Sequence, residues 1–195
     1  MRIGLTGGVG CGATEVARRL QAKGIRIVSG DEAGHAVLTL PQVKSALQER
    51  FGTGIFDQQG EVDRKRLGEI IFADEQARRE LNRIVHPMLL DILTAEVRQA
   101  EAESGIAVVD AALIYEWGLA GFFHKVIVVS APWETRISRA TTRSGLTREQ
   151  VLQRIAAQWP LEKKVERADF IIDNIGTLEE LYQKVDSLWS EILRA

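Results

Sequence analysis

Residues 2–14 read RIGLTGGVGCGAT, a short apolar run that passes directly into glycines at positions 7, 8, 10 and 12. Residues 14–22 then carry apolar side chains at helical spacing, and residues 25–29, IRIVS, form a β-branched run between two glycines. The order of strand, glycine-rich loop, helix and strand predicts a βαβ unit of about thirty residues. In such a unit the two strands are parallel and the crossover is right-handed.

The glycine-rich loop follows the phosphate-binding pattern G-x-x-x-x-G-K-[ST] except at its lysine. Its residues are Gly7, Gly8, Val9, Gly10, Cys11, Gly12, Ala13 and Thr14. In this pattern backbone N–H groups surround the phosphates of a nucleotide, the lysine reaches the β- and γ-phosphates, and the hydroxyl group coordinates Mg²⁺. We therefore expect the loop to bind a nucleotide, with Thr14 on the metal ion. A plain tight turn is the alternative.

Ala13 stands where the pattern has lysine. The loss of one charged hydrogen bond costs about 1.5–3 kcal/mol of binding free energy. If the cation stabilises charge that develops during reaction, its loss costs roughly 10²–10³ in rate, as for one oxyanion donor. Glu15 adds a negative charge to the first helical turn. Both features predict weaker nucleotide binding, although the loop amides, the helix dipole and Mg²⁺ still favour it.

The middle of the chain changes character, because residues 32–102 carry apolar side chains at helical spacing without a convincing strand. Pro41 is expected to open one helix, Asp63 to cap a helix that ends near Phe72, and Pro87 to begin a helix that continues to about Ala102. Strands are expected at residues 106–111, 125–129 and 170–173, and a last helix from about Thr177.

This order predicts an α/β fold, a three-layer parallel sheet of the P-loop NTPase type with a helical insertion and a lid. Residues 1–31 and 105–195 are expected to form the nucleotide-binding core, and residues 32–104 the insertion. The charged helical stretch within residues 144–168 is expected to act as a lid.

Composition excludes several classes of protein. Of 195 residues, 45% are hydrophobic and 27% charged, which is typical of a folded globular chain. The formal net charge of −2 gives no general attraction to nucleic acid or to an acidic membrane, so we expect neither as a partner. Cys11 is the single cysteine, which excludes an internal disulfide framework. No apolar run is long enough to span a bilayer and the first residues do not resemble a secretory signal, so a cytoplasmic location is expected.

Candidate catalytic residues follow the predicted strands, where the carboxyl ends of parallel strands border the ligand crevice of such folds. Asp31 comes just after the second strand, where it would accept the proton of an attacking hydroxyl group or help hold Mg²⁺; a helix N-cap is the alternative. Asp110 and Glu116 follow the third strand, and a solvated loop acid is the alternative for each. A lone histidine such as His86 is more often structural than catalytic.

Basic residues form a second group of candidates. Arg136, Arg139 and Arg143 are spaced i, i+3 and i+7 after the strand at 125–129, so they share one stripe of a helix. An anion is the natural partner of such a stripe, and a solvated basic face is the alternative. Further cations that could replace the charge of the missing lysine are Arg154, Lys163, Lys164 and Arg167.

The chain resembles the bacterial dephospho-coenzyme A kinases over essentially its whole length. The segments that carry the resemblance are IGLTGGVG, GDEAGHAV, DRKRLGEIIF, LNRIVHP, DAALIYEWGL, RSGLT, RIAAQWPLEKK and ADFIIDNIGTLEEL. The resemblance implies a transferase that uses ATP to phosphorylate the ribose 3'-hydroxyl group of dephospho-coenzyme A, the last step of coenzyme A synthesis. It also implies a nucleotide core, a helical substrate domain and a lid.

The resemblance assigns roles residue by residue. Asp31 matches the carboxylate proposed as base for the 3'-hydroxyl group, and Gly7 to Thr14 match the phosphate loop, with Thr14 on the Mg²⁺ side. His86 and Glu116 match substrate-binding positions, and Arg139 and Arg143 match arginines that face the phosphates.

Three features depart from the family pattern. The family loop usually ends in glycine, lysine, serine and threonine, whereas this one ends in Gly12, Ala13, Thr14 and Glu15. Ser29 replaces the first of two common aspartates, and Trp117 replaces a small residue. A slowed kinase is therefore the leading hypothesis. A non-catalytic relative that binds nucleotide or coenzyme A is the alternative.

Overall fold

The structure is a computed structural model that describes residues 1–194. Its elements in chain order are β1 (Arg2–Gly7), α1 (Ala13–Ala22), β2 (Ile27–Ser29), α2 (Gly30–Thr39), α3 (Pro41–Phe51), η1 (Thr53–Ile55), α4 (Arg64–Ala73), α5 (Glu75–Ser104), β3 (Ala107–Asp110), η2 (Ala120–Phe122), β4 (Lys125–Ser130), α6 (Trp133–Ser144), α7 (Arg148–Ala156), α8 (Leu161–Val165), β5 (Phe170–Asp173) and α9 (Leu178–Ile192). The described helices include none with both the length and the apolarity needed to cross a membrane.

The chain forms two compact units. The first consists of Met1–Ser29 together with the chain from Val97 onward, and the second of Gly30–Glu96. The second unit thus ends inside α5, and the last turns of this helix belong to the first unit, where Val97 and Ala100 are fully buried. The helix is continuous across this boundary.

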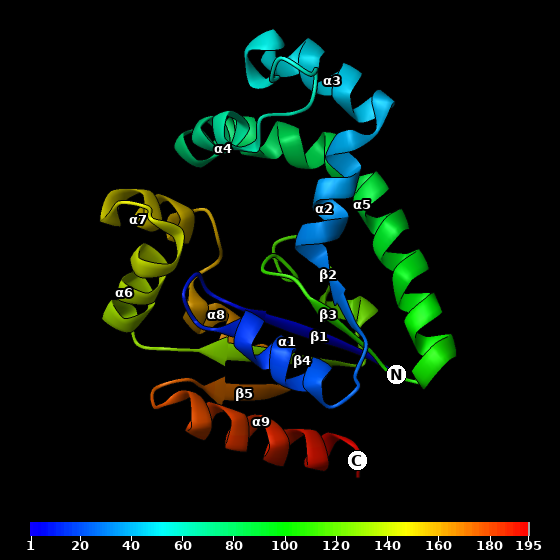
Figure 1. Ribbon diagram of the computed structural model, residues 1–195, viewed down its shortest axis with the longest axis vertical. Coiled ribbons are helices and arrows are strands. Elements are labelled where there is room, and N and C mark those ends of the chain that lie inside the picture. The colour runs from blue at the N-terminus through cyan, green and yellow to red at the C-terminus, as the bar shows by residue number, and fades with distance from the viewer. Residues whose placement is uncertain (195) are drawn as a thin grey trace. The chain divides into compact units, whose positions relative to one another are not determined.

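A five-stranded sheet with the order β2-β3-β1-β4-β5 forms the centre of the first unit (Figure 1). Every paired strand in it is parallel, which confirms the predicted α/β class. The central strands β1 and β4 are almost entirely buried, as expected for apolar runs covered on both faces. All five expected strands form, with ends that differ from the prediction by two residues or fewer.

Helices α1 and α9 run side by side along the sheet (Figure 1). Their apolar faces join the main core, which includes Val16 and Leu20 of α1 and Val185 and Trp189 of α9. Each of these helices is amphipathic, so one stripe is buried and the other carries charge. Thr177 caps α9 through a capping box, as the predicted start of the last helix requires.

The helical unit contains α2, α3, α4 and most of α5. Pro41 lies at the start of α3 and the Asp63 carboxylate accepts from two backbone amides of α4, so both predicted helix starts are confirmed. The prediction that Pro87 begins a helix is wrong, because α5 runs unbroken from Glu75 to Ser104 and contains it.

Proline inside a helix removes one backbone donor and costs about 3 kcal/mol. The α5 helix continues through Pro87 because apolar side chains on both sides of it are buried, among them Leu81 and Leu89. Burial of one leucine side chain is worth about 1.5–3 kcal/mol, so packing before and after the proline offsets its cost.

The segment expected to act as a lid has two parts. Helix α7 packs on α6 in a small cluster of its own that includes Ile137, Ala140 and Val151. Helix α8 instead joins the main core through Leu161, and its Lys164 is fully buried. A lid role for residues 144–168 stays a prediction.

Asp186 on α9 provides a test of the packing between α9 and α1. Its Oδ1 accepts from Arg19 Nε at 2.9 Å and lies 3.1 Å from Lys23 Nζ. The hydrogen bond from Arg19 and the nearby Lys23 charge hold the pKa of Asp186 at about 2. The unfolded-state pKa is near 3.9, so this stabilisation is complete above about pH 4 and disappears as the pH falls through about 2.

Replacement Asp186→Asn is therefore expected to lower the free energy of unfolding at pH 7 by about 0.5–1 kcal/mol, because the pair is partly solvated. The difference from wild type should shrink on going to pH 2. Urea unfolding at both pH values measures it, and an equal loss at pH 7 and pH 2 would show that the charge of Asp186 is not the cause.

Candidate functional site

The glycine-rich loop joins β1 to α1 at the carboxyl end of the central strand. Gly10 and Gly12 have φ values of +76° and +94°, in the left-handed region that glycine adopts without strain. The Cys11 N–H donates to Gly8 O at 3.0 Å and closes the turn. Burial raises the pKa of the Cys11 thiol, against an opposing effect of the Arg136 charge, so Cys11 packs as a neutral side chain.

The start of α1 presents backbone donors without protein acceptors. Gly12 occupies the N-cap, and its carbonyl oxygen accepts from the amides of Glu15 and Val16 at 3.0 and 3.3 Å. Among the described residues, the amides of Gly12, Ala13 and Thr14 donate to no carbonyl or side-chain oxygen. Together with the helix dipole, such amides form a site for an anion.

Other elements hold the outer side of the loop. Asn174, which is buried just after β5, donates from Nδ2 to Cys11 O at 2.9 Å. The Val9 N–H donates to Gln158 Oε1 at 3.2 Å. A side chain at Gly12 would place its Cβ 2.4 Å from Asn174 Nδ2, so this contact also requires glycine. Sequence patterns did not single out Asn174 or Gln158, although both lie in the family-like segments ADFIIDNIGTLEEL and RIAAQWPLEKK.

The three arginines of α6 have different environments despite their shared stripe. Arg136 is buried and donates from Nε to Val9 O at 3.1 Å. Arg139 donates from Nη1 to Asn174 O at 3.1 Å. Arg143 is exposed, and its Nη1 lies 3.5 Å from the Thr14 hydroxyl oxygen. The structure therefore brings all three arginines to the loop or to the residue that holds it.

Glu116 forms an ion pair with Lys164, which contradicts the alternative of a solvated loop acid. Its Oε1 lies 2.8 Å from Lys164 Nζ and accepts from the Trp159 N–H at 2.7 Å. Lys164 is fully buried and also donates to Ala112 O at 2.7 Å. Burial lowers the pKa of Lys164, and the hydrogen bond to Glu116 opposes that shift. Lys164 is thus committed to Glu116, which argues against it as the replacement for the missing lysine.

Two predicted site residues lie in the helical unit. Asp31 is exposed in the first turn of α2, which begins one residue earlier at Gly30. This start argues against the alternative of an N-cap at Asp31. His86 lies half-buried within α5.

Polar residues also end β2 and β3. Ser29 and Asp110 are partners in the register of these two strands, so they lie side by side at the carboxyl end of the sheet. Within residues 1–194, no cluster of three or more His, Cys, Asp or Glu side chains forms a ready-made metal site.

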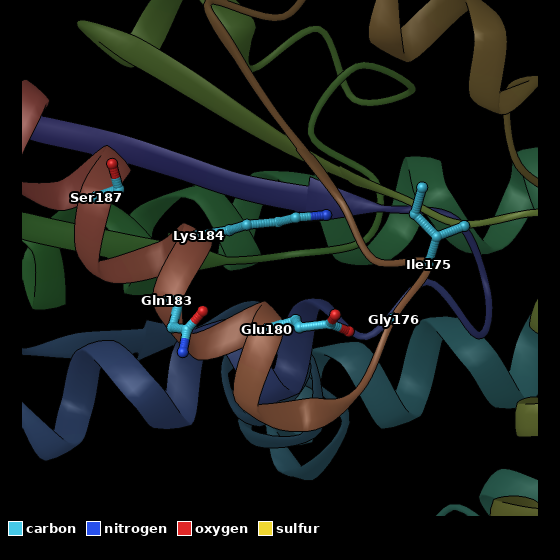
Figure 2. A pocket seen from close by; sticks show the side chains of 6 residues that line it. All are labelled: Ile175, Gly176, Glu180, Gln183, Lys184 and Ser187. Carbon is cyan, nitrogen blue, oxygen red and sulfur yellow. The ribbon is translucent and has the colours of Figure 1, made fainter.

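A shallow pocket of about 520 Å³ lies on α9 and the connection from β5 (Figure 2). Its lining residues are Ile175, Gly176, Glu180, Gln183, Lys184 and Ser187. It contains none of the predicted site residues, but Ile175 directly follows Asn174, which holds the loop.

The Glu116–Lys164 pair predicts a large loss of stability when one partner is removed. Replacement Lys164→Met leaves the Glu116 carboxylate buried without its cation, which costs about 3–5 kcal/mol. Adding Glu116→Gln to Lys164→Met removes that charge and should recover part of the loss. Urea unfolding of both single variants and the double variant measures the coupling, and additive losses would contradict it.

Comparisons with known proteins agree with this geometry. A family model described as dephospho-CoA kinase matches residues 1–180. The dephospho-CoA kinase of Geobacter sulfurreducens is 41% identical over 193 residues, 97% of this chain and 97% of the relative. That of Thermobifida fusca is 41% identical over 196 residues, 100% of this chain and 97% of the relative.

A solved structure supports the same conclusion. Dephospho-CoA kinase from Campylobacter jejuni matches with a TM-score of 0.73 and 25% identity, over 98% of this chain and 96% of that one. These matches confirm the resemblance that the sequence segments carry, and the P-loop kinase fold with it. The chain belongs to the dephospho-CoA kinase family.

Proposed function

We propose that this chain transfers the γ-phosphate of ATP to the 3'-hydroxyl group of dephospho-coenzyme A, the last step of coenzyme A synthesis. The observation that carries the proposal is family membership along nearly the whole chain. The open amides at the start of α1 support it, because they provide the anion site that a bound nucleotide needs.

The phosphate side of the reaction is assigned to the first unit. The amides of residues 7–14 bind the phosphates, and the α1 dipole favours their negative charge. Arg139 and Arg143 are assigned to the phosphates as well, and Arg143 already lies beside Thr14. Charge-assisted hydrogen bonds from arginine are stronger than neutral ones and hold a phosphate in a defined orientation.

Asp31 is assigned as the base that accepts the proton of the 3'-hydroxyl group. As the 3'-hydroxyl oxygen attacks the γ-phosphorus, the bond from that phosphorus to the β–γ bridging oxygen breaks and ADP leaves. The hydroxyl proton passes to the Asp31 carboxylate. Asp31 is exposed, so its carboxylate is available to a substrate.

The residues present fit Mg²⁺. This ion prefers oxygen ligands, keeps several waters and is usually bound by one or two protein oxygens together with substrate phosphates. Thr14 supplies such an oxygen at the start of α1, beside amides that suit phosphates. When bound, Mg²⁺ neutralises charge on the transferred phosphate.

The acceptor side is assigned to His86, Glu116 and the helical unit. Glu116 Oε1 is occupied by Lys164 and Trp159, so a contact with substrate falls to Oε2, which is buried and has no hydrogen-bond partner among the described residues. We assign residues 32–104 to binding of dephospho-coenzyme A and residues 144–168 to a lid.

Replacement Asp31→Asn is expected to lower kcat by about 10²–10⁴, the range of general-base catalysis, with little change in affinity for ATP. The measurement is coenzyme A formation from ATP, Mg²⁺ and dephospho-coenzyme A. Glu191→Gln, which removes an exposed carboxylate from α9, outside the segments assigned to either substrate, is the control. Wild-type protein that binds dephospho-coenzyme A but forms no coenzyme A would instead identify a non-catalytic relative.

The Thr14 hydroxyl group gives a separate test. Thr14→Ser keeps the oxygen and should retain activity within about tenfold, whereas Thr14→Val should lose it at low Mg²⁺ and regain part of it at high Mg²⁺. Initial rates across a Mg²⁺ titration measure this. Identical Mg²⁺ dependence of both variants would remove Thr14 from the metal site.

A further inference from the structure

We propose that Arg136 supplies, from α6, the positive charge that the phosphate loop lacks at Ala13, and that its guanidinium group binds the terminal phosphates of ATP. The inference rests on the proposed function for its role in turnover. It also makes a claim about nucleotide binding that stands without turnover.

The loop and α6 are fitted to each other at Arg136. A Cβ atom at Gly10 would lie 2.1 Å from Arg136 O, so only glycine permits the backbone of α6 to come this close. A Cβ atom at Gly8 would lie 2.5 Å from Arg136 Nη2 and 2.9 Å from Cζ. The guanidinium group therefore lies directly against the backbone of the loop, in space that a side chain at Gly8 would fill.

The charge of Arg136 is buried without a counter-ion. The residue is 4% exposed, and none of the described carboxylates forms an ion pair with it. Its Nε donates to Val9 O at 3.1 Å, and its Cζ lies 5.6 Å from the centroid of the Trp133 ring. Within the part of the chain that the structure describes, the terminal amino groups have no acceptor.

A buried cation without an anion is costly, because desolvation is not repaid by an ion pair. The structure places this cation on a loop whose following helix presents open amides. Both features are relieved by the same kind of ligand, an anion bound to the loop. A guanidinium group anchored at Nε still has four N–H donors, in the planar arrangement that matches phosphate oxygens.

The other cations near the loop are less suited to this role. Arg139 Nη1 is used by Asn174 O, and Lys164 is paired with Glu116. Arg143 is exposed, so solvent screens its charge. Arg136 combines burial, contact with the loop and lack of a carboxylate partner.

Nucleotide affinities distinguish an Arg136 that binds the phosphates from an Arg136 that only supports the loop. Arg136→Gln keeps an N–H donor on a shorter side chain but removes the charge. It should weaken binding of MgATP by about 10- to 100-fold. Binding of AMP should change by less than about threefold, because AMP lacks the terminal phosphates. Arg136→Lys keeps the charge and should stay within about tenfold of wild type for MgATP. Isothermal titration calorimetry measures all three affinities.

The second part of the experiment restores a lysine to the loop. In the Arg136→Gln background, Ala13→Lys should recover most of the lost MgATP affinity, and most of a loss in kcat of roughly 10²–10³. In the wild-type background Ala13→Lys should bring a smaller gain in either quantity than in the Arg136→Gln background, because the phosphate already has its cation. If Arg136 only supported the loop, a lysine at position 13 would not restore the lost affinity.

Arg26→Gln is the matched control, because it removes one arginine charge at a position that is 53% exposed and pairs only loosely with Glu103. Circular dichroism melts confirm that each variant is folded, and Arg136→Lys keeps the test open if Arg136→Gln does not fold.

Equal weakening of AMP binding and MgATP binding, or additive effects of the two substitutions, would overturn the proposal. So would wild-type protein that binds no nucleotide. Absence of coenzyme A formation with intact MgATP binding would reject the proposed turnover and leave this inference standing.

Discussion

The start of α1 carries backbone N–H groups that the described protein atoms leave without acceptors, and side chains from α6 and from the end of β5 contact the loop before it. Arg136 contacts the loop, Arg143 lies beside Thr14, and Arg139 holds the residue that binds the loop from outside. The acid nearest in sequence, Glu15, is paired with Arg18. The net charge of the chain is −2, so the phosphate attraction that the proposed function requires is local and falls to these few groups.

Close approach of backbones makes this arrangement possible. Gly8, Gly10 and Gly12 each leave space that another element occupies, namely α6 for the first two and Asn174 for the third. The glycine pattern of the loop therefore has two causes. One is the left-handed φ of Gly10 and Gly12, and the other is the contact of α6 with the loop at Gly8 and Gly10. The second cause cannot be read from the loop alone, because it depends on a helix more than a hundred residues later.

Sequence patterns predicted the features that local chemistry determines. The five strands are buried apolar runs, and the capped starts of α4 and α9 depend on side chains within a few residues. Features that depend on distant partners were missed. Pro87 is tolerated because residues before and after it in α5 are packed. Glu116 forms an ion pair with Lys164, which lies 48 residues later in the sequence. The arginine stripe was predicted as a unit, but its members have different partners. Arg136 and Arg143 lie at the loop, whereas Arg139 donates to Asn174, which holds the loop from outside.

Phosphate binding is coupled to the position of whichever structural element carries the cation. A lysine within the loop moves with the loop, and its contact with phosphate is independent of α6. A cation donated by α6 links the phosphate to the position of that helix, because the backbone of Arg136 itself contacts Gly10. Helix α7 is joined to α6 by the Arg148–Glu134 ion pair and by the cluster around Val151. Any displacement of α6 and α7 would therefore move the buried charge away from the loop, so the same contacts that hold these helices also determine the strength of phosphate binding.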